Sequence, residues 1–217
     1  MLEKAKIRPD LLLLLSLLLI IVIFPVLDHG GVRRLILGGL MFVPVIIATV
    51  RLSEVKGWMW PSLSLMMGAF IVAVANAIRP SRTLDGIKWG LLTAFFALTV
   101  VGLFSYLKNA RAVSNSHLYT AVSIYLLLGM QWFALYSAID DLYPGAILRN
   151  HASLADRQSE LLYFSLVTLS TVGYGDVVPL DGVVRMLAAL EGVTGVLYVA
   201  ITVALLVSAY KSTSTSS

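Results

Sequence analysis

The sequence lacks cysteine and is poor in charge. Only 13% of its 217 residues are charged, whereas 59% are apolar. The absence of cysteine excludes disulfides, thiolate metal sites and cysteine nucleophiles. The charged fraction is about half of the ~25% found in an ordinary soluble domain. This composition excludes a water-soluble globule, and its high apolar content excludes a disordered chain.

The charged residues are missing from particular parts of the chain. Six stretches contain a single charged residue, Glu191, and these stretches are 11–27, 35–50, 57–78, 89–107, 118–139 and 186–210. A bilayer core is spanned by roughly 20 apolar residues, a length that the two shortest stretches reach with their flanks. Because backbone groups in hydrocarbon must bond within their own segment, each stretch is predicted to be a transmembrane helix. We therefore expect an all-α, polytopic membrane protein with six transmembrane helices.

The connection between the last two stretches is long, with some 46 residues between 139 and 186. Loops of this length are usually functional. It contains an apolar helical stretch at 160–170, then the sequence Thr-Val-Gly-Tyr-Gly-Asp at 171–176, and then Pro179. The motif therefore lies between two membrane segments, directly after a short helix.

The motif at 171–176 resembles the selectivity filter of potassium channels, and the resemblance to the pore region of that family covers roughly residues 118–210. The chain is similar to prokaryotic-type potassium channels of the pore-loop superfamily, in the six-transmembrane form without a charged voltage sensor. The resemblance implies a fourfold homotetramer with a re-entrant pore helix at about 160–170. It also implies that K⁺ is bound by the backbone of the filter residues, with the ligands at Thr171, Val172, Gly173 and Tyr174, followed by Gly175.

The residue types of the filter suit this chemistry. Carbonyl oxygens replace the water shell of K⁺ without the strong trapping that a ring of carboxylates causes. Successive carbonyls must then point to one side, whereas an ordinary strand alternates them. Glycine enters conformations with positive φ at little cost. We therefore expect positive φ at Gly173 and Gly175, with the Val172 and Tyr174 side chains pointing away from the ion.

The aromatic residues before the filter differ from those of many relatives. Tyr163 and Phe164 stand where those relatives have a tryptophan pair, so no indole N–H is available for the Tyr174 hydroxyl. Thr168 is the candidate partner for that hydroxyl. These residues are predicted to support the filter from behind.

Two further positions set expectations for the outer end of the filter. Some relatives carry aspartate in place of the filter tyrosine and conduct sodium as well, and Tyr174 argues against this behaviour. In some bacterial relatives a carboxylate four positions before the filter pairs with the aspartate that follows it. That position is Val167 in this chain, so Asp176 is expected to lack this partner.

Glu191 is the one ionisable residue within a predicted span, and burial of such residues is expensive. It lies five positions before Val196, which is about 140° around an ideal helix, so it should face away from the pore. We expect it to support the filter from behind through a hydrogen bond to Thr168, Ser165 or Gln131. Direct ion contact and pH sensing are the alternatives.

The last apolar stretch is expected to line the inner pore. Gly195 matches the hinge glycine of the family, and close helix packing is the equal alternative. Helical spacing from Gly195 predicts a shared apolar face, made of Val196, Val199, Val203 and Val207. Such a face can gate a pore by dewetting. Packing of this stripe against a neighbouring helix is the alternative.

The chain divides into a four-helix transmembrane domain at 1–112 and a pore domain at 113–217. A voltage sensor needs several gating charges, each worth about 2.3 kcal/mol per 100 mV. The fourth stretch has no basic residue, with Lys88 only at its start, so the first domain is not expected to sense voltage. Tetramer assembly, lipid contact or anchoring are its expected roles, and binding of an unknown ligand is the alternative.

The sequence thus predicts a potassium-selective channel in the plasma or inner membrane, with both termini cytoplasmic. No nucleophile sits with a base and an orienting acid, so we expect no enzyme. No cofactor is expected beyond the permeant K⁺. The expected partners are three further copies of the chain and membrane lipids, with room for an unidentified regulatory partner and no sign of nucleic-acid binding. The alternatives are a weakly conducting or non-selective channel subunit, and a membrane scaffold or transporter in which the loop is incidental.

Overall fold

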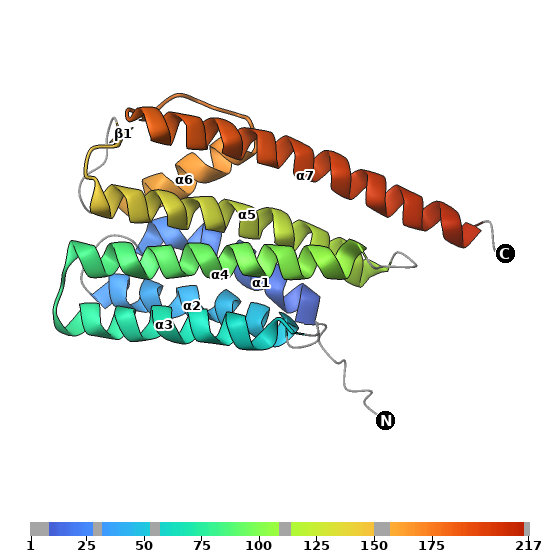
Figure 1. Cartoon of the computed structure of the whole chain (residues 1–217), viewed down its shortest axis with the longest axis horizontal. Coiled ribbons are helices and arrows are strands. Elements are labelled where there is room, and N and C mark those ends of the chain that lie inside the picture. Colours follow the sequence, from blue (N-terminus) through green and yellow to red (C-terminus); the bar gives the residue numbers. More distant parts are fainter. Residues whose placement is uncertain (1–8, 28–31, 53–56, 109–113, 150–156, 215–217) are drawn as a thin grey trace.

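A computed structural model describes residues 9–27, 32–52, 57–108, 114–149 and 157–214. Figure 1 shows the arrangement of its helices and its short strands. In chain order these are α1 (Pro9–Leu27), α2 (Val32–Leu52), α3 (Met59–Ile78), α4 (Arg82–Lys108), α5 (Asn115–Leu142), β1 (Ile147–Arg149), α6 (Arg157–Leu169), β2 (Val177–Pro179) and α7 (Gly182–Ser214).

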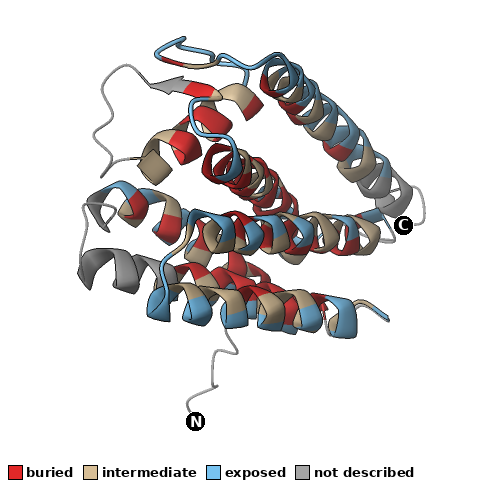
Figure 2. Cartoon of the chain, turned by 60° about the vertical axis from the view of Figure 1, so that its left-hand side comes forward, coloured by how far each residue is buried: buried red, intermediate tan, exposed pale blue. Residues whose placement is uncertain are grey.

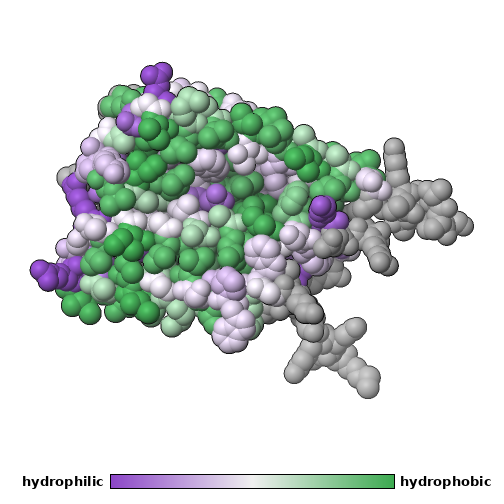
Figure 3. All heavy atoms as spheres, in the orientation of Figure 1, coloured by the Kyte–Doolittle hydropathy of each residue, from purple (hydrophilic) through white to green (hydrophobic). Residues whose placement is uncertain are grey.

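The long helices coincide with the six apolar stretches of the sequence. Four of them, α3, α4, α5 and α7, are long and apolar enough to cross a membrane. The apolar parts described for α1 and α2 are shorter, Pro9–Pro25 and Gly39–Leu52. The face drawn in Figure 3 is mostly apolar, and hydrophilic side chains gather toward the end where α4 begins and α5 ends. The prediction of helices able to span a membrane is confirmed for these four, and the crossing of α1 and α2 stays a prediction.

Helix α5 lies at the centre of the molecule. It packs against α1, α4, α6 and α7, and Figure 2 shows it buried along most of its length. The Phe133 ring on α5 meets Phe24 of α1 at 5.4 Å and Trp89 of α4 at 5.1 Å, both edge-to-face. Such aromatic pairs add about 0.5–1.5 kcal/mol each beyond the area they bury. Aromatic packing on α5 therefore joins the first helices to the last ones.

A buried polar cluster holds the beginning of α5. The Asp10 carboxylate of α1 accepts hydrogen bonds from Arg51 of α2, from Ser116 and, at 3.2 Å, from Thr120 of α5. The Arg51 guanidinium lies over the Tyr106 ring of α4, 4.3 Å from its centre. Asp10 and Arg51 are only 4% and 3% exposed. This cluster therefore joins four helices at the end of the molecule where α1 begins.

The predicted domain boundary between residues 112 and 113 lies outside the described residues. On either side of it, α4 and α5 pack side by side. The buried apolar residues form one continuous core that runs from Leu13 in α1 to Val184 in α7. The helices before residue 112 and those after it therefore share one core.

The two short strands form a hairpin that the sequence did not predict. β1 and β2 pair antiparallel, with Ile147 opposite Pro179 and Leu148 opposite Val178. The backbone N–H of Leu180 adds a bond of 2.9 Å to the Ala146 carbonyl. The hairpin returns the chain to the end at which α5 finished. α6 and the loop after it therefore enter the molecule and leave it at the same end (Figure 1).

Removal of the buried cation provides a test of the cluster under α5. We expect Arg51→Met to lower the free energy of unfolding by ~3–5 kcal/mol, because it leaves the Asp10 carboxylate buried without a cation. Lys88→Met is the matched control, because Lys88 pairs with Asp85 at 2.7 Å in a partly exposed position, where such a pair is worth up to ~1 kcal/mol. The measurement is thermal unfolding of the purified protein in detergent. A Tm loss for Arg51→Met no larger than that for Lys88→Met would contradict this account.

Candidate functional site

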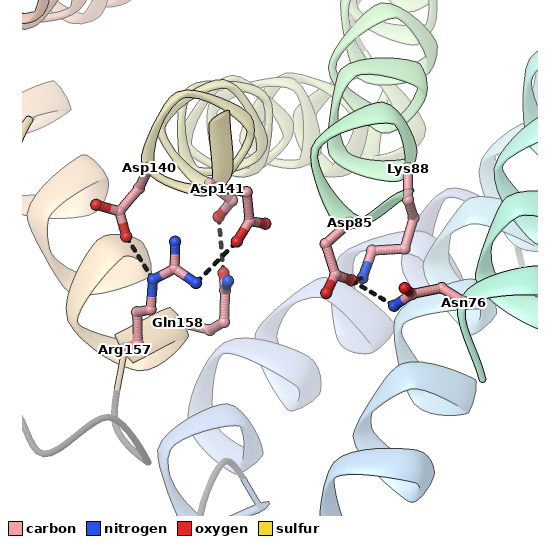
Figure 4. A network of polar contacts seen from close by, with 8 residues as sticks. Asn76, Asp85, Lys88, Asp140, Asp141, Arg157 and Gln158 are labelled. Carbon is pink, nitrogen blue, oxygen red and sulfur yellow. Dashed lines mark hydrogen bonds and ion pairs between the residues drawn. The ribbon is translucent and has the colours of Figure 1, made fainter. Parts of the chain in front are cut away.

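Helix α6 is fixed at its beginning by a charged clasp. Arg157 Nε lies 2.5 Å from Asp140 Oδ2, and Arg157 Nη1 lies 2.7 Å from Asp141 Oδ1. Both aspartates are buried at the end of α5. The next residue, Gln158, accepts a hydrogen bond of 2.8 Å from Ser137 of α5. Figure 4 shows Gln158 beside Arg157 and the two aspartates. The clasp sets where α6 begins, which is slightly before the predicted residue 160.

The other end of α6 leads directly into the loop at 170–176. Backbone N–H groups of this loop turn back to the last carbonyls of the helix. Thr171 N donates to Thr168 O at 2.9 Å, and Val172 N donates to Val167 O at 3.0 Å. Gly173 N lies 3.4 Å from the same Val167 oxygen. The N–H groups in the first part of the loop, up to Gly173, are therefore used by the helix end, which leaves the carbonyls there to point elsewhere.

The backbone of the loop alternates in the sign of φ. Thr171, Gly173 and Gly175 have φ of 60°, 56° and 79°, and the two residues between them do not have positive φ. This alternation turns successive peptide planes toward one side. The prediction of positive φ is confirmed for both glycines. A Cβ on either glycine would meet nothing within 4 Å, so these positions need glycine for its backbone freedom and not for space.

The positive φ of Thr171 was not predicted. A β-branched residue in this region is strained, at ~1–3 kcal/mol. The positive φ of Thr171 extends by one step the alternation in the sign of φ that is seen at Gly173 and Gly175. The two-residue spacing of the glycines is therefore the sequence signal from which a positive φ at residue 171 could have been predicted. Strain of this kind persists where the surrounding structure holds it, and the bonds to α6 hold Thr171 here.

The carbonyl oxygens of residues 171–175 accept no hydrogen bond from any of the described residues. Residues 171–175 are exposed in the single chain, so these carbonyls are open to water or to a cation. No group of three or more histidine, aspartate and glutamate side chains in the described part of the chain could hold a metal ion. The groups that the loop offers to a ligand are therefore its backbone oxygens.

The loop is exposed in the single chain. Val172 and Tyr174 keep 52% and 73% of their surface exposed, although both carry large apolar side chains. Thr168, the predicted partner of the Tyr174 hydroxyl, forms no hydrogen bond with it within one chain. A shallow groove of about 510 Å³ runs between α7 and the end of α6 with its loop. Its lining residues are Thr168, Thr171 and Gly173 and, on α7, Ala188, Ala189, Gly192, Val193, Val196 and Leu197.

A tyrosine contacts the C-terminal end of the loop. Tyr163 Oη donates to Asp176 Oδ2 at 2.8 Å, and the Tyr163 ring stacks parallel on Tyr174 with centroids 6.4 Å apart. This hydrogen bond lowers the pKa of Asp176 below its ordinary value and raises the pKa of Tyr163 to about 12. Asp176 therefore lacks a carboxylate partner at position 167, as expected, and takes the Tyr163 hydroxyl of α6 as its partner instead. Phe164 points the other way and packs on Tyr136 of α5 at 5.0 Å.

Glu191 is wholly buried where α7 meets α5 and α6. Tyr136 Oη donates to Glu191 Oε2 at 2.7 Å, and Ser165 Oγ lies 2.6 Å from Oε1. Ser165 was a predicted partner. The other two predicted partners, Thr168 and Gln131, form no hydrogen bond with Glu191 among the described residues. Tyr136 was not predicted as a partner of Glu191. The one feature of the sequence that points to it is that a tyrosine hydroxyl within an apolar stretch needs a hydrogen-bond partner.

Gly195 packs against the end of α6. A Cβ at this position would lie 2.0 Å from the Leu169 carbonyl oxygen. This distance supports the close-packing interpretation, and the hinge stays a prediction. The prediction that Gly195 shares a face with the valines was wrong, because Gly195 is buried and they are about half exposed. The exposed residues are Val196 at 57%, Val199 at 50%, Val203 at 54% and Val207 at 49%.

Comparison with known proteins points to the same region. Residues 120–212, from α5 to the end of α7, match a family described as "Ion channel". A 51-residue segment is 39% identical to a Rhodopseudomonas palustris protein named "Putative potassium channel protein". That segment covers 24% of this chain and 12% of the relative, so the match spans about an eighth of the relative's length. No solved structure matches the chain.

The close approach of α7 to α6 yields a test. We expect Gly195→Ala to lower the free energy of unfolding by ~1–3 kcal/mol or more, because the added methyl group would overlap a backbone oxygen that has no room to move. Gly90→Ala on α4 is the matched control, since its Cβ would meet nothing within 4 Å and alanine is favoured in a helix by ~0.5–1 kcal/mol. Thermal unfolding in detergent measures both. Similar unfolding temperatures for the two variants would overturn the packing account.

Proposed function

We propose that the chain is one subunit of a homotetrameric, potassium-selective channel. The observation that carries this proposal is the row of backbone carbonyls at residues 171–175, which have alternating φ and no partner among the described residues. Oxygens of this kind replace the hydration shell of K⁺. Four copies of Thr171, Val172, Gly173 and Tyr174 surround the ions, with the Thr171 hydroxyl adding an inner ring of oxygens.

The tetramer is proposed because the carbonyl oxygens of the loop in one chain can reach an ion from one side only. A single chain supplies ligands from one direction only, and closed cyclic symmetry is the common way for identical chains to surround an axis. The apolar groove between the loop and α7 is exposed in the single chain, which suits contact with a neighbouring subunit. The exposed valines of α7 then line the inner pore, where Val199, Val203 and Val207 form an apolar gate that closes by dewetting.

The pore helix adds a favourable field. α6 ends at the loop, and the C-terminal end of a helix carries a partial negative charge that favours a cation nearby. Tyr163 and Asp176 hold the outer end of the filter through their hydrogen bond. The selectivity proposed here therefore uses backbone oxygens and a helix dipole, without a ring of charged side chains.

The rest of the chain forms the membrane frame of this channel. Residues 113–217 make up the pore domain, and residues 1–112 form a four-helix domain that anchors it through α1 and α4. All six long helices cross the plasma or inner membrane, with both termini in the cytoplasm. Because the fourth helix carries no row of arginines, the channel opens without steep voltage dependence. The word "potassium" in the name of the Rhodopseudomonas palustris relative supports the choice of ion.

Rubidium flux from proteoliposomes tests the function directly. The wild-type protein should release ⁸⁶Rb⁺ in a barium-sensitive manner. Gly173→Ala should reduce this flux at least ~10-fold, because alanine is strained at a φ of 56°. Gly57→Ala is the matched control, because Gly57 also has positive φ, 89°, and equally free space, but lies outside the filter.

Flux that Gly173→Ala and Gly57→Ala reduce equally would contradict the proposal. Each variant must also be shown to insert and to assemble, by chemical cross-linking of the reconstituted protein. A wild-type protein that assembles and releases no rubidium would contradict the proposal as well.

A further inference from the structure

Glu191 is buried without a cation. Its side chain is 0% exposed, and none of the ion pairs among the described residues includes it. The groups that face it are few. From α5 these are the hydroxyl of Tyr136 and, at longer range, Tyr125, and from α6 the facing group is the hydroxyl of Ser165. A charged carboxylate in such a place is expensive, whereas a neutral carboxylic acid is not.

The hydrogen bonds around Ser165 give an independent indication of the charge. Ser165 Oγ lies 2.8 Å from the Gly129 carbonyl oxygen and 2.6 Å from Glu191 Oε1. A hydroxyl group has one hydrogen to donate. If Glu191 were ionised, both neighbours would be acceptors, and one of these two short contacts would lack a hydrogen. If Glu191 is protonated, it donates to Ser165, and Ser165 donates to Gly129.

The protonated form completes a continuous chain of hydrogen bonds. Tyr136 donates to Glu191 Oε2, Glu191 donates through Oε1 to Ser165, and Ser165 donates to the Gly129 carbonyl. Each hydrogen then has one acceptor, and no donor is left over. We propose that Glu191 acts in this neutral form as a positioning residue, which locks α6 between α5 and α7 and so holds the filter in its conducting shape. This inference rests on the proposed channel function.

Close packing of the backbone makes the filter sensitive to this lock. A Cβ at Gly129 on α5 would lie 2.7 Å from Leu166 Cδ2 on α6, and a Cβ at Gly195 on α7 would lie 2.0 Å from Leu169 O. α6 is thus held closely from both sides, with Ser165 one residue before the first of these contacts and Thr171 two residues after the second. When Glu191 loses its proton, it becomes an acceptor that competes with Gly129 for the single Ser165 hydrogen. The α5–α6 bond is then lost, and the filter is less well held.

Two substitutions separate the neutral form from the charge. Glu191→Gln keeps a neutral group with one acceptor and an N–H donor, so it preserves the whole chain of bonds. Glu191→Leu removes the chain and leaves the Tyr136 hydroxyl buried without a partner. Glu160→Gln is the matched control, because it makes the same chemical change in the first turn of α6, away from this lock.

The experiment records K⁺ conductance of the reconstituted full chain in planar bilayers from neutral to alkaline pH. Wild type conducts at neutral pH and loses conductance as pH rises, because the conducting form is the protonated one. Glu191→Gln conducts within about 2-fold of wild type at neutral pH and loses the alkaline fall, since its amide keeps the same bonds. Glu191→Leu conducts at least ~10-fold less, the effect of a buried donor left unsatisfied. Glu160→Gln keeps the wild-type profile.

Two results would overturn the proposal. One is loss of conductance in Glu191→Gln as severe as in Glu191→Leu, with assembly intact, because it would mean that the charge is needed. The other is an alkaline fall that persists unchanged in Glu191→Gln, because another group would then be titrating.

A second measurement does not depend on conduction. The infrared difference spectrum of wild type minus Glu191→Gln at neutral pH should contain the carbonyl stretch of a protonated carboxylic acid, and a carboxylate signal in its place would overturn the neutral form.

If assembled wild type does not conduct at all, the proposed function fails. The neutral lock is then still decided by this spectrum, and by whether Glu191→Gln unfolds at a higher temperature than Glu191→Leu.

Discussion

The row of unpaired backbone carbonyls at 171–175 is the constraint on which the rest of the structure depends. Polypeptide backbone rarely exposes oxygens in this way, because carbonyls at membrane depth without a partner are unfavourable. The loop does so because the N–H groups of its first residues, up to Gly173, are bonded to the end of α6 and its φ angles alternate in sign. One of those angles is strained at Thr171, so the loop needs a rigid support.

The surrounding helices supply that support from several directions. The Arg157 clasp fixes the beginning of α6, the buried Glu191 carboxyl joins its middle to α5 and α7, and Gly195 lets α7 approach its end. Tyr163 holds Asp176 beyond the loop. The first four helices support the loop indirectly, because they pack on α5 through the rings around Phe133 and through the Asp10 cluster. The side of α7 away from this support is left apolar and exposed, as a pore lining in a tetramer requires.

The features that the sequence predicted correctly depend on local structure. Apolar stretches of sufficient length form helices whatever their tertiary arrangement, and the residue type of Gly173 and Gly175 is enough to predict their positive φ. The partners that it missed are set by tertiary packing. Tyr163 meets Asp176 only because the hairpin returns the chain past α6, and Tyr136 is 55 residues away from Glu191. The side of α7 that carries Gly195 was wrongly predicted to be the same as that of the valines. Helical spacing gives the angle between two residues around the helix axis, but it does not say which side packs against another helix.

The central claim is that uncharged backbone oxygens of residues 171–175 select potassium. The most direct test is the reversal potential of the reconstituted protein with K⁺ on one side of the bilayer and Na⁺ on the other. The account predicts a reversal potential displaced far from zero, in the direction that drives K⁺ back to the K⁺ side. A reversal potential near zero, with currents carried equally well by Na⁺, would contradict it.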